Sequence, residues 1–298
     1  MKSGFVAIVG RPNAGKSTLI NNLIGEKVSI ISYKAETTRN SIVGVLNRDD
    51  LQIVFVDTPG IHKSNSVLGN YMNKEAFKQA DGVDVIYYLC DAKKGLNEDD
   101  EEILKQMFGY HVPIFLLLNK IDLISKDQIL SRILYANDKY QFNEIIPISA
   151  ANKENIDELL NTTLGYLHDE VKFYPDDVTT NTTLEFRIAE LIREKVLLKT
   201  EQEIPHLVAC KVDKIRYTEK RAFVEATIIC NRDSHKAIII GHNGSKLKQI
   251  NQAAVKDISE LLGCKTSLNL FVKVEEDWMN KNSKLLDLGY YIGNKYDR

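Results

Sequence analysis

A glycine-rich segment near the start of the chain has the residue types and spacing of a phosphate-binding loop. Residues 10–17 read Gly-Arg-Pro-Asn-Ala-Gly-Lys-Ser and match the pattern G-x4-G-K-[ST], which is expected roughly 0.008 times by chance in this composition. Glycines let the backbone wrap a polyphosphate with its N–H groups pointing inward, and the N-terminus of the following helix adds positive potential. In this pattern Lys16 contacts the β- and γ-phosphates, and Ser17 gives an oxygen ligand to Mg²⁺.

Three further motifs indicate which nucleotide the loop binds. In residues 57–60, Asp-Thr-Pro-Gly, the carboxylate can hold Mg²⁺ through water and the last N–H can contact a γ-phosphate. In residues 119–122, Asn-Lys-Ile-Asp, the carboxylate can accept hydrogen bonds from N1–H and the exocyclic amine of guanine, which adenine does not offer on that edge. Residues 149–150 are placed for a backbone contact to the guanine oxygen. Each motif alone could be a turn or a helix entry, but all follow predicted strands, where open α/β sheets bind ligands. Together they predict a GTP-binding domain.

The segment between the first two motifs predicts a switch. Residues 34–39 read Lys-Ala-Glu-Thr-Thr-Arg, and a threonine there can coordinate Mg²⁺ and respond to the γ-phosphate. The alternative is a solvated loop.

Ile61 follows the Asp-Thr-Pro-Gly motif, and an aliphatic side chain cannot orient water, so we expect intrinsic hydrolysis to be slow or to depend on another catalytic group. His62 could be that group, or it could be a surface turn residue.

The elements that position these motifs are short strands alternating with helices. Apolar strands without alternation favour a parallel sheet covered on both faces, whereas a polar turn at residues 47–50 predicts an antiparallel hairpin. The fold class is therefore α/β with a mixed six-stranded sheet. The pattern predicts strands at residues 5–9, 41–46, 51–57, 83–91, 112–118 and 144–148, and helices at residues 16–24, 68–80, 98–108, 126–139 and 156–168.

The periodicity stops at residues 174–183, which are rich in Pro, Asp and Thr. This composition predicts an exposed linker between a nucleotide-binding domain over residues 1–173 and a second domain over residues 184–298. The order of elements in the second domain predicts a small α+β fold, α-β-β-α-α-β with an added helix. These elements are expected at residues 184–198, 206–215, 221–229, 234–240, 246–262 and 267–274, with a C-terminal helix from Trp278.

A second glycine-containing turn lies in this domain, at residues 241–244, Gly-His-Asn-Gly. Two glycines at this spacing are expected about 0.85 times by chance, so the position between two helices carries the interpretation. There the backbone can approach a nucleic-acid backbone, with three lysines near the phosphates and Ile239 and Ile240 lining a groove for unstacked bases. The alternative is a pair of packing glycines with solvated lysines.

The composition is that of an ordinary globular protein. The chain has 298 residues, a net charge of −2, 44% hydrophobic and 27% charged residues, which excludes disordered, collagen-like and disulfide-scaffold classes. Residues 1–180 hold 19 basic and 25 acidic side chains, whereas residues 181–298 hold 20 and 16. The four cysteines form no CxxC pair, and neither a membrane span nor a signal peptide is indicated. We therefore expect a cytoplasmic protein.

The motifs resemble those of known families. The first domain is similar to translation-factor-type GTPases of the group that shares GRPNAGKS and TTR, and the second resembles a type II KH domain. Together GRPNAGKST, ETTR, DTPG, NKID, ISA, IREK, IIIGHNG and VKVEEDW resemble the Era family of ribosome-associated GTPases over essentially the full chain. This resemblance implies a Ras-like P-loop GTPase domain followed by a type II KH domain.

The resemblance also implies a function. We expect a GTPase that binds GTP or GDP with Mg²⁺, and Asn13 matches a position that helps seat K⁺ beside the phosphates. The expected partner is small-subunit ribosomal RNA near its 3′ end, within maturation of the small ribosomal subunit, with no DNA partner. A monomer with a peripheral position at the inner face of the cell membrane is also implied. The alternative is an RNA-binding module whose nucleotide site is mainly structural, but the complete set Lys16, Ser17, Thr38 and Asp57 argues against it.

The expected site residues fall into four groups. The groups expected to act in hydrolysis are Lys16, Thr38 and Gly60, and the Mg²⁺ ligands are Ser17, Thr38 and Asp57, with Thr37 beside them. The expected nucleotide contacts are Gly10, Arg11, Pro12, Asn13, Ala14, Gly15, Lys16, Ser17, Thr18, Asp57, Thr58, Pro59, Gly60, Ile61, Asn119, Lys120, Ile121, Asp122, Ser149 and Ala150. The expected RNA contacts are Lys236, Ile240, Gly241, His242, Asn243, Gly244, Lys246 and Lys248.

Overall fold

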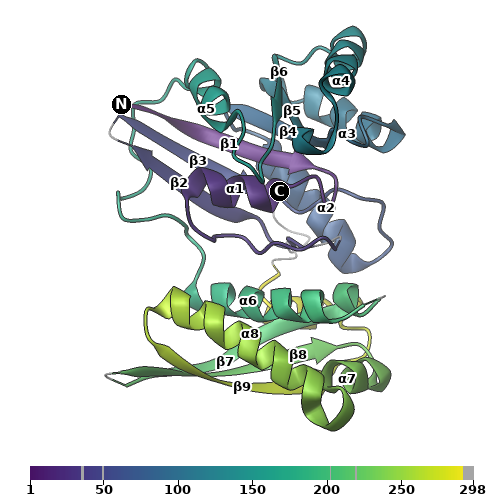
Figure 1. Cartoon of the computed structure of the whole chain (residues 1–298), viewed down its shortest axis with the longest axis vertical. Coiled ribbons are helices and arrows are strands. Elements are labelled where there is room, and N and C mark those ends of the chain that lie inside the picture. The colour runs from purple at the N-terminus through teal and green to yellow at the C-terminus, as the bar shows by residue number, and fades with distance from the viewer. Residues whose placement is uncertain (35–36, 49, 202, 219, 291–298) are drawn as a thin grey trace. The chain divides into compact units, whose positions relative to one another are not determined.

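The computed structural model describes residues 1–290 except 35, 36, 49, 202 and 219, and these residues form two compact units (Figure 1). The first unit comprises residues 1–64 and 69–181, and the second comprises residues 65–68 together with the chain from residue 182 onward. Two positions of the expected switch segment, 35 and 36, and the last eight residues of the expected second domain lie outside the described residues.

The first unit is built on a six-stranded sheet in the order β2-β3-β1-β4-β5-β6. Neighbouring strands are parallel except for β2 and β3, which are antiparallel, so the mixed α/β sheet is confirmed. The strands are β1 (Lys2–Gly10), β2 (Ile42–Arg48), β3 (Leu51–Asp57), β4 (Val85–Asp91), β5 (Ile114–Asn119) and β6 (Glu144–Ile148). The helices are α1 (Lys16–Ile24), α2 (Val67–Ala80), α3 (Glu98–Phe108), α4 (Lys126–Lys139) and α5 (Ile156–Leu164), with a 3₁₀ turn at Ile121–Leu123.

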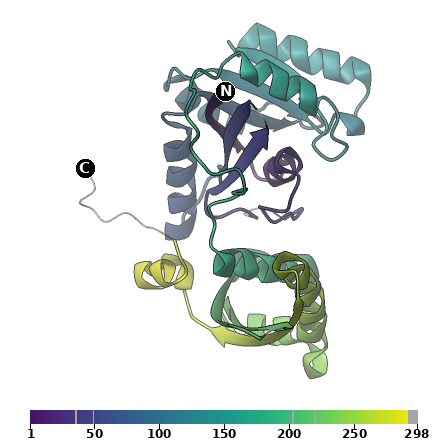
Figure 2. The same ribbon diagram turned by 90° about the vertical axis from the view of Figure 1, so that its left-hand side faces the viewer.

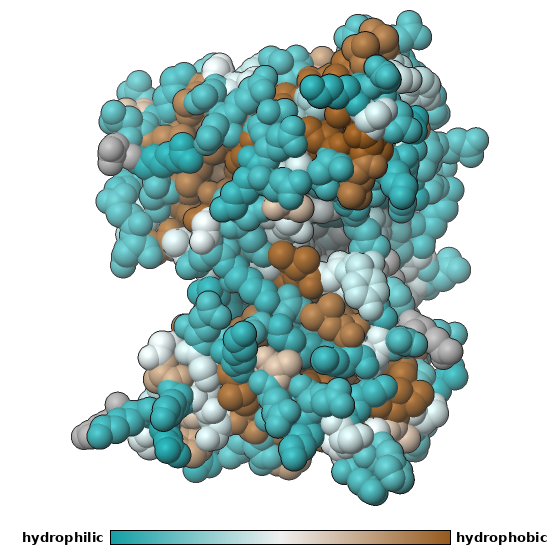
Figure 3. Space-filling view, in the orientation of Figure 1, coloured by the Kyte–Doolittle hydropathy of each residue, from teal (hydrophilic) through white to brown (hydrophobic). Residues whose placement is uncertain are grey.

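Helices cover both faces of this sheet, which explains why its strands are apolar without alternation. On one face Tyr88 and Leu116 pack in a cluster with side chains of α2, α3 and α4. On the other face the hydroxyl of the fully buried Tyr87 is hydrogen-bonded to Thr163 of α5. Figure 3 shows hydrophobic side chains at the surface over α4, where Leu130 and Leu134 are 56% and 60% exposed. No described helix combines the length and the apolar character that a membrane crossing needs.

Several sequence-based boundaries in this unit differ from the structure, and two of the differences have a clear local reason. The expected turn at residues 47–50 is shorter, because Asn47 and Arg48 belong to β2 and pair with Gln52 and Leu51. The amide of Gln52 donates to the side chain of Asn47 at 2.6 Å, and this cross-strand pair extends the hairpin with polar residues. Helix α5 ends at Leu164 instead of His168, where Gly165 follows and its low helix propensity ends the helix.

The polar segment that follows α5 is fastened to the edge of the sheet. The buried side chain of Gln52 accepts from the N–H groups of Phe173 at 2.7 Å and Tyr174 at 2.9 Å, and it donates to the carbonyl of Tyr174 at 2.8 Å. Further along, the N–H of Val45 donates to the carbonyl of Thr179 at 2.8 Å. This segment therefore satisfies backbone groups of the edge strand β2.

We expect Gln52→Ala to lower the free energy of unfolding by about 2 kcal/mol, because it leaves part-buried backbone groups at residues 173 and 174 without their partner. Urea unfolding of the whole chain measures this effect, and proteolysis within residues 173–180 should accelerate. Gln141→Ala removes an exposed glutamine and is the matched control. Equal unfolding midpoints for the two variants would contradict the assigned role of Gln52.

The second unit is an α+β domain with a three-stranded sheet in the order β7-β8-β9. Strands β7 and β8 are antiparallel, and β8 and β9 are parallel, so the expected α-β-β-α-α-β order is confirmed. Helices α6, α7 and α8 pack on one face of the sheet around a single hydrophobic cluster (Figure 2). The elements are α6 (Leu184–Lys199), β7 (Val208–Tyr217), β8 (Arg221–Cys230), α7 (Asp233–Ile240), α8 (Ser245–Leu262), β9 (Lys265–Val274) and α9 (Asn282–Asp287), with 3₁₀ turns at Ile204–Leu207, His242–Gly244 and Trp278–Asn280.

The C-terminal helix begins later than the sequence pattern indicates. Trp278 starts a 3₁₀ turn, Lys281 has an extended backbone, and the helix begins at Asn282. The indole of Trp278 is fully buried and donates to the carbonyl of Leu207 at 3.1 Å. This contact holds the turn against the domain and separates it from the helix.

Candidate functional site

The glycine-rich loop connects β1 to α1 and leaves the N-terminus of α1 open to an anion. Gly15 is the N-cap residue, with φ +104°, and no side chain caps the described start of α1. A β-carbon at this position would overlap the side chain amide of Asn119, so only glycine fits. The free N–H groups of the first helical turn therefore face the loop as an anion-binding site.

Lys16 places a buried positive charge in this loop. Its ammonium donates to the carbonyls of Gly10 at 3.0 Å and Arg11 at 3.1 Å, and the residue is only 6% exposed. Burial lowers the pKa of Lys16 to about 8, and the nearby carboxylate of Asp57 opposes that shift. Two neutral carbonyls compensate a buried cation incompletely, so the site is suited to an anionic phosphate.

The three expected metal ligands lie together at the end of β3. One oxygen of Asp57, Oδ2, accepts from Ser17 at 3.1 Å and Thr38 at 3.4 Å, and the hydroxyls of Ser17 and Thr38 are 2.8 Å apart. Its other oxygen, Oδ1, is buried without a hydrogen-bond partner among the described residues. Burial raises the pKa of Asp57, whereas Lys16 and the hydroxyl donors lower it. Hard oxygen donors around a carboxylate with an unpartnered oxygen fit Mg²⁺.

A third hydroxyl, that of Ser29, also reaches this carboxylate and was not identified from the sequence. Ser29 is 1% exposed and donates to Oδ2 of Asp57 at 2.9 Å. Asn21 holds Ser29 in place, since its side chain accepts from the N–H groups of Val28 at 3.0 Å and Ser29 at 2.9 Å and donates to the carbonyl of Ser29 at 2.7 Å. Asn21 lies on α1 one turn beyond Ser17, so the helix that begins the phosphate loop also supports the metal site.

The residues after Asp57 bind the end of β3 to the phosphate loop. The hydroxyl of Thr58 donates to the carbonyl of Ile8 at 2.8 Å, and Gly60 lies against Pro12.

Ile61 is 7% exposed and packs in the hydrophobic cluster of the sheet. An aliphatic side chain in this position leaves it without a water-orienting group, as the sequence indicates. His62 lies in the next turn, and its ring nitrogen Nδ1 is 3.0 Å from the carbonyl oxygen of Gly60.

The last residue of β5 connects the phosphate loop to the loop after β6, and the residues after it add further contacts. Asn119 is 2% exposed, donates to the carbonyl of Ala14 at 2.7 Å and accepts from the N–H of Ala150 at 2.9 Å. Lys120 donates to the carbonyl of Asn13 at 2.7 Å. The exposed Asp122 accepts from the hydroxyl of Ser149 at 2.6 Å, which orients its carboxylate.

Two charged residues have partners that the sequence pattern does not indicate. The guanidinium of Arg11 lies 2.9 Å from Asp99 and 3.6 Å from Asp100 of α3, so its side chain is already paired and its backbone carries the contact to Lys16. Lys120 forms a 2.8 Å ion pair with Asp91 at the end of β4. Asp91 ends β4, and Asp99 and Asp100 lie in the first turn of α3. None of these acidic residues belongs to a sequence motif, so the pairs could not be predicted.

The structure places every expected nucleotide and metal residue around one end of the sheet, where the parallel strands β1, β3, β5 and β6 terminate. These are Gly10, Arg11, Pro12, Asn13, Ala14, Gly15, Lys16, Ser17, Thr18, Thr38, Asp57, Thr58, Pro59, Gly60, Ile61, Asn119, Lys120, Ile121, Asp122, Ser149 and Ala150. Within the described residues, no cluster of three His, Cys, Asp or Glu side chains forms a second metal site.

The second glycine-containing turn lies between α7 and α8. Gly241 and Gly244 have φ of +74° and +75°, and His242 and Asn243 between them are exposed. A β-carbon on Gly241 would lie 3.0 Å from the backbone nitrogen of Lys246, so the chain turns tightly here. Exposed backbone next to a helix start is the geometry that admits a close nucleic-acid backbone.

The side chains around this turn differ in one respect from the expectation. Ile239 cannot line a groove, because it is fully buried in the hydrophobic cluster of the domain, whereas Ile240 is half-buried. Ile238, which the sequence pattern did not single out, is 43% exposed. Lys236 and Lys246 are half-buried and Lys248 is exposed.

Comparison with known proteins places both units. Residues 5–120 match the family model of 50S ribosome-binding GTPases, and residues 203–279 match the KH domain model. An Era variant from Aquifex aeolicus bound to GDP and AlF4⁻ is 39% identical with a TM-score of 0.95, over 98% of this chain and 100% of that one. Era in complex with MgGDPNP and nucleotides 1506–1542 of 16S ribosomal RNA is also 39% identical, with a TM-score of 0.96 and the same coverage.

The fold and the site define a P-loop GTPase, in which a Ras-like domain is followed by a KH domain. The chain belongs to the Era family, as 39% identity over nearly its whole length shows. The fold class and the family resemblance inferred from the sequence are both confirmed.

We expect Ser29→Ala to raise by about tenfold the Mg²⁺ concentration needed to retain GDP, because it removes a hydrogen bond to a charged metal ligand. Release of a fluorescent GDP analogue at graded Mg²⁺ concentrations measures this, and with excess EDTA the variant and the parent should release GDP equally fast. Ser41→Ala, a serine beside the switch that contacts Glu75 instead, is the control. An unchanged Mg²⁺ requirement would show that Ser29 does not support Asp57.

Proposed function

We propose that this GTPase is a nucleotide-dependent switch that binds small-subunit ribosomal RNA near its 3′ end and acts in assembly and maturation of the small ribosomal subunit. The observation that carries the proposal is the convergence of Lys16, Ser17, Thr38 and Asp57 in one buried site on a chain that also carries a KH domain. The Era structure with a fragment of 16S ribosomal RNA supports the choice of partner.

We propose that the site binds GTP or GDP with Mg²⁺. The metal would be held by Ser17 and Thr38 and, through water, by Asp57, and it would neutralise charge on the phosphates. Lys16 and the N–H groups of the phosphate loop and Gly60 stabilise negative charge on the β- and γ-phosphate oxygens. Asp122 accepts hydrogen bonds from guanine, with its carboxylate oriented by Ser149.

Thr38 is the residue through which the nucleotide state would act. Its hydroxyl lies against Ser17 and Asp57, and it belongs to the expected switch segment, residues 34–39. A γ-phosphate with its metal would order this segment, and hydrolysis would release it. The two-state element is therefore attached to the metal site itself.

The rate of GTP hydrolysis should depend on a group other than the side chain at position 61. Because Ile61 is buried, we propose that K⁺ seated beside the phosphates near Asn13 supplies positive charge to the transition state. Equal turnover in Na⁺ and K⁺ buffers would contradict this role. A single-turnover rate at the uncatalysed background would favour the alternative of a mainly structural nucleotide site.

Other properties expected from the sequence or implied by the family resemblance stay predictions. These are the monomeric state, the cytoplasmic location and the peripheral position at the inner face of the cell membrane. The nucleic-acid partner is expected to be RNA and not DNA.

We expect Asp122→Asn to change the base preference from guanine to xanthine, because an amide donates a hydrogen bond where the carboxylate accepted two. Titration with GTP and XTP measures the change, and GTP affinity should fall by at least tenfold. Asp127→Asn alters an exposed carboxylate in the first turn of α4 and should leave both affinities unchanged. GTP affinity that survives in Asp122→Asn would refute the base contact.

We expect the double variant His242→Asp and Asn243→Asp to abolish RNA binding and spare GTP binding, because two negative charges then face the RNA backbone. Gel shift with a 3′-terminal fragment of small-subunit ribosomal RNA measures this. Asn282→Asp with Ser283→Asp adds the same charge at the exposed start of α9 and is the control. Equal RNA affinity of the two double variants would move the RNA site away from the turn.

A further inference from the structure

Among the described residues, the face of the KH sheet that lies opposite α6, α7 and α8 is covered only at one end, by α9. Side chains alternate along β8, and Val224, Ala226 and Ile228 pack in the core with α6 and α8. The residues between them, which include Phe223 and Thr227, therefore point to the other face. In β9 the corresponding outward residues include Lys265 and Phe271.

Two phenylalanines stand on this open face. Phe223 is 42% exposed and Phe271 is 51% exposed. Phe223 is paired with Ser267 and Phe271 with Thr227, so the two rings lie on neighbouring strands about 13 Å apart along the sheet. Polar residues separate them, so they do not form the continuous apolar patch that indicates a protein-docking surface.

The charge of the same face is positive. Among the described residues of the three strands, the outward side chains include six basic ones and two acidic ones, with Asp213 bound to Thr227 at 2.7 Å and Glu225 lying 3.8 Å from Arg216. The basic residues are Lys211, Lys214, Arg216, Arg221, Lys265 and Lys273.

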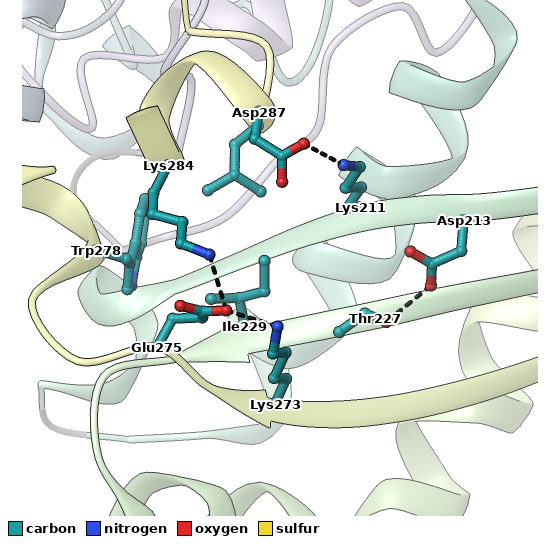
Figure 4. Close-up of a pocket in the computed structure, with 10 residues that line it drawn as sticks. Lys211, Asp213, Thr227, Ile229, Lys273, Glu275, Trp278, Lys284 and Asp287 are labelled. Atoms are coloured by element: carbon teal, nitrogen blue, oxygen red, sulfur yellow. Dashed lines mark hydrogen bonds and ion pairs between the residues drawn. The ribbon is translucent and has the colours of Figure 1, made fainter. Parts of the chain in front are cut away.

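Apart from the Arg216–Glu225 pair, the positive charge is compensated at one end of the face. There α9 and the end of β9 enclose a pocket of about 210 Å³ (Figure 4). Glu275 lies 2.6 Å from Lys273 and 3.0 Å from Lys284, and Asp287 lies 2.5 Å from Lys211. These ion pairs hold α9 on the sheet, so the uncompensated charge lies toward the other end, where Lys214 and Lys265 are exposed beside Phe223.

We propose that this face is a second binding surface for single-stranded RNA, with bases stacked on Phe223 and Phe271 and phosphates held by Lys214 and Lys265. Exposed aromatic rings on a basic sheet are the combination that binds unpaired bases, because every base has a face that stacks. The proposal rests on the proposed RNA-binding function and extends it, since the open face and the glycine turn between α7 and α8 would hold different stretches of one strand.

The test compares two fluorescein-labelled unpaired RNAs from the 3′ end of small-subunit ribosomal RNA, one of about 6 and one of about 24 nucleotides, because only the longer one can occupy both surfaces. We expect the double variant Phe223→Ala and Phe271→Ala, in the full chain, to bind the longer RNA at least tenfold more weakly and the shorter RNA unchanged. Phe223→Tyr with Phe271→Tyr keeps the rings and should restore the affinity. Leu130→Ala with Leu134→Ala removes two exposed side chains of α4 and is the control.

The charged residues give an independent measurement. For Lys214→Ala with Lys265→Ala, the slope of log affinity against log salt concentration for the longer RNA should fall by about 1.4, the value for two lost phosphate contacts on a single strand. An unchanged slope would show that Lys214 and Lys265 do not contact the phosphates of the RNA. Thermal unfolding of each variant checks that the domain is intact.

Outcomes for the two proposals are separable. If Phe223→Ala with Phe271→Ala binds the longer RNA with unchanged affinity, the inference is overturned, and a protein becomes the expected partner of this face. The variant with aspartates at positions 242 and 243 should lose both RNAs. If it keeps both while the phenylalanine variant loses the longer one, the glycine turn is wrong and the sheet surface stands.

Discussion

A buried carboxylate and a buried ammonium share one small site, and the arrangement of the first domain follows from that constraint. Asp57 and Lys16 are both removed from water, and each shifts the pKa of the other. Three hydroxyls and two carbonyls compensate them in part. Such a site is stable only if the loops that supply these groups are held firmly, because a buried charge that loses its partners is costly.

The parallel sheet supplies that firmness. Strands that run side by side deliver their following loops to one edge, and buried amides then connect loops that are distant in sequence. Asn119 joins the phosphate loop to residue 150, and Asn21 joins α1 to Ser29. Ala14 directly precedes Gly15 and α1, the helix that carries Asn21, so both asparagines support the segment that runs from the phosphate loop into α1.

Motifs with fixed spacing could be predicted from the sequence, because their chemistry requires particular residue types in order. Contacts made by single polar residues could not. Ser29 lies in an irregular loop without a motif, and Gln52 meets its partner Phe173 across 121 positions. Ile239 was misassigned because α7 has eight residues and ends in three isoleucines, so hydrophobic periodicity does not fix which one faces the core.

Because residues 173–180 dock along the edge of the sheet, the connection from this edge to α6 is short. The backbone of residue 180 is bridged to Gly44, and Thr183 caps α6, so the chain between these two anchored positions spans at most about 11 Å. Since β2 begins four residues after Thr38, residues 173–180 are held by the strand that follows the expected switch segment.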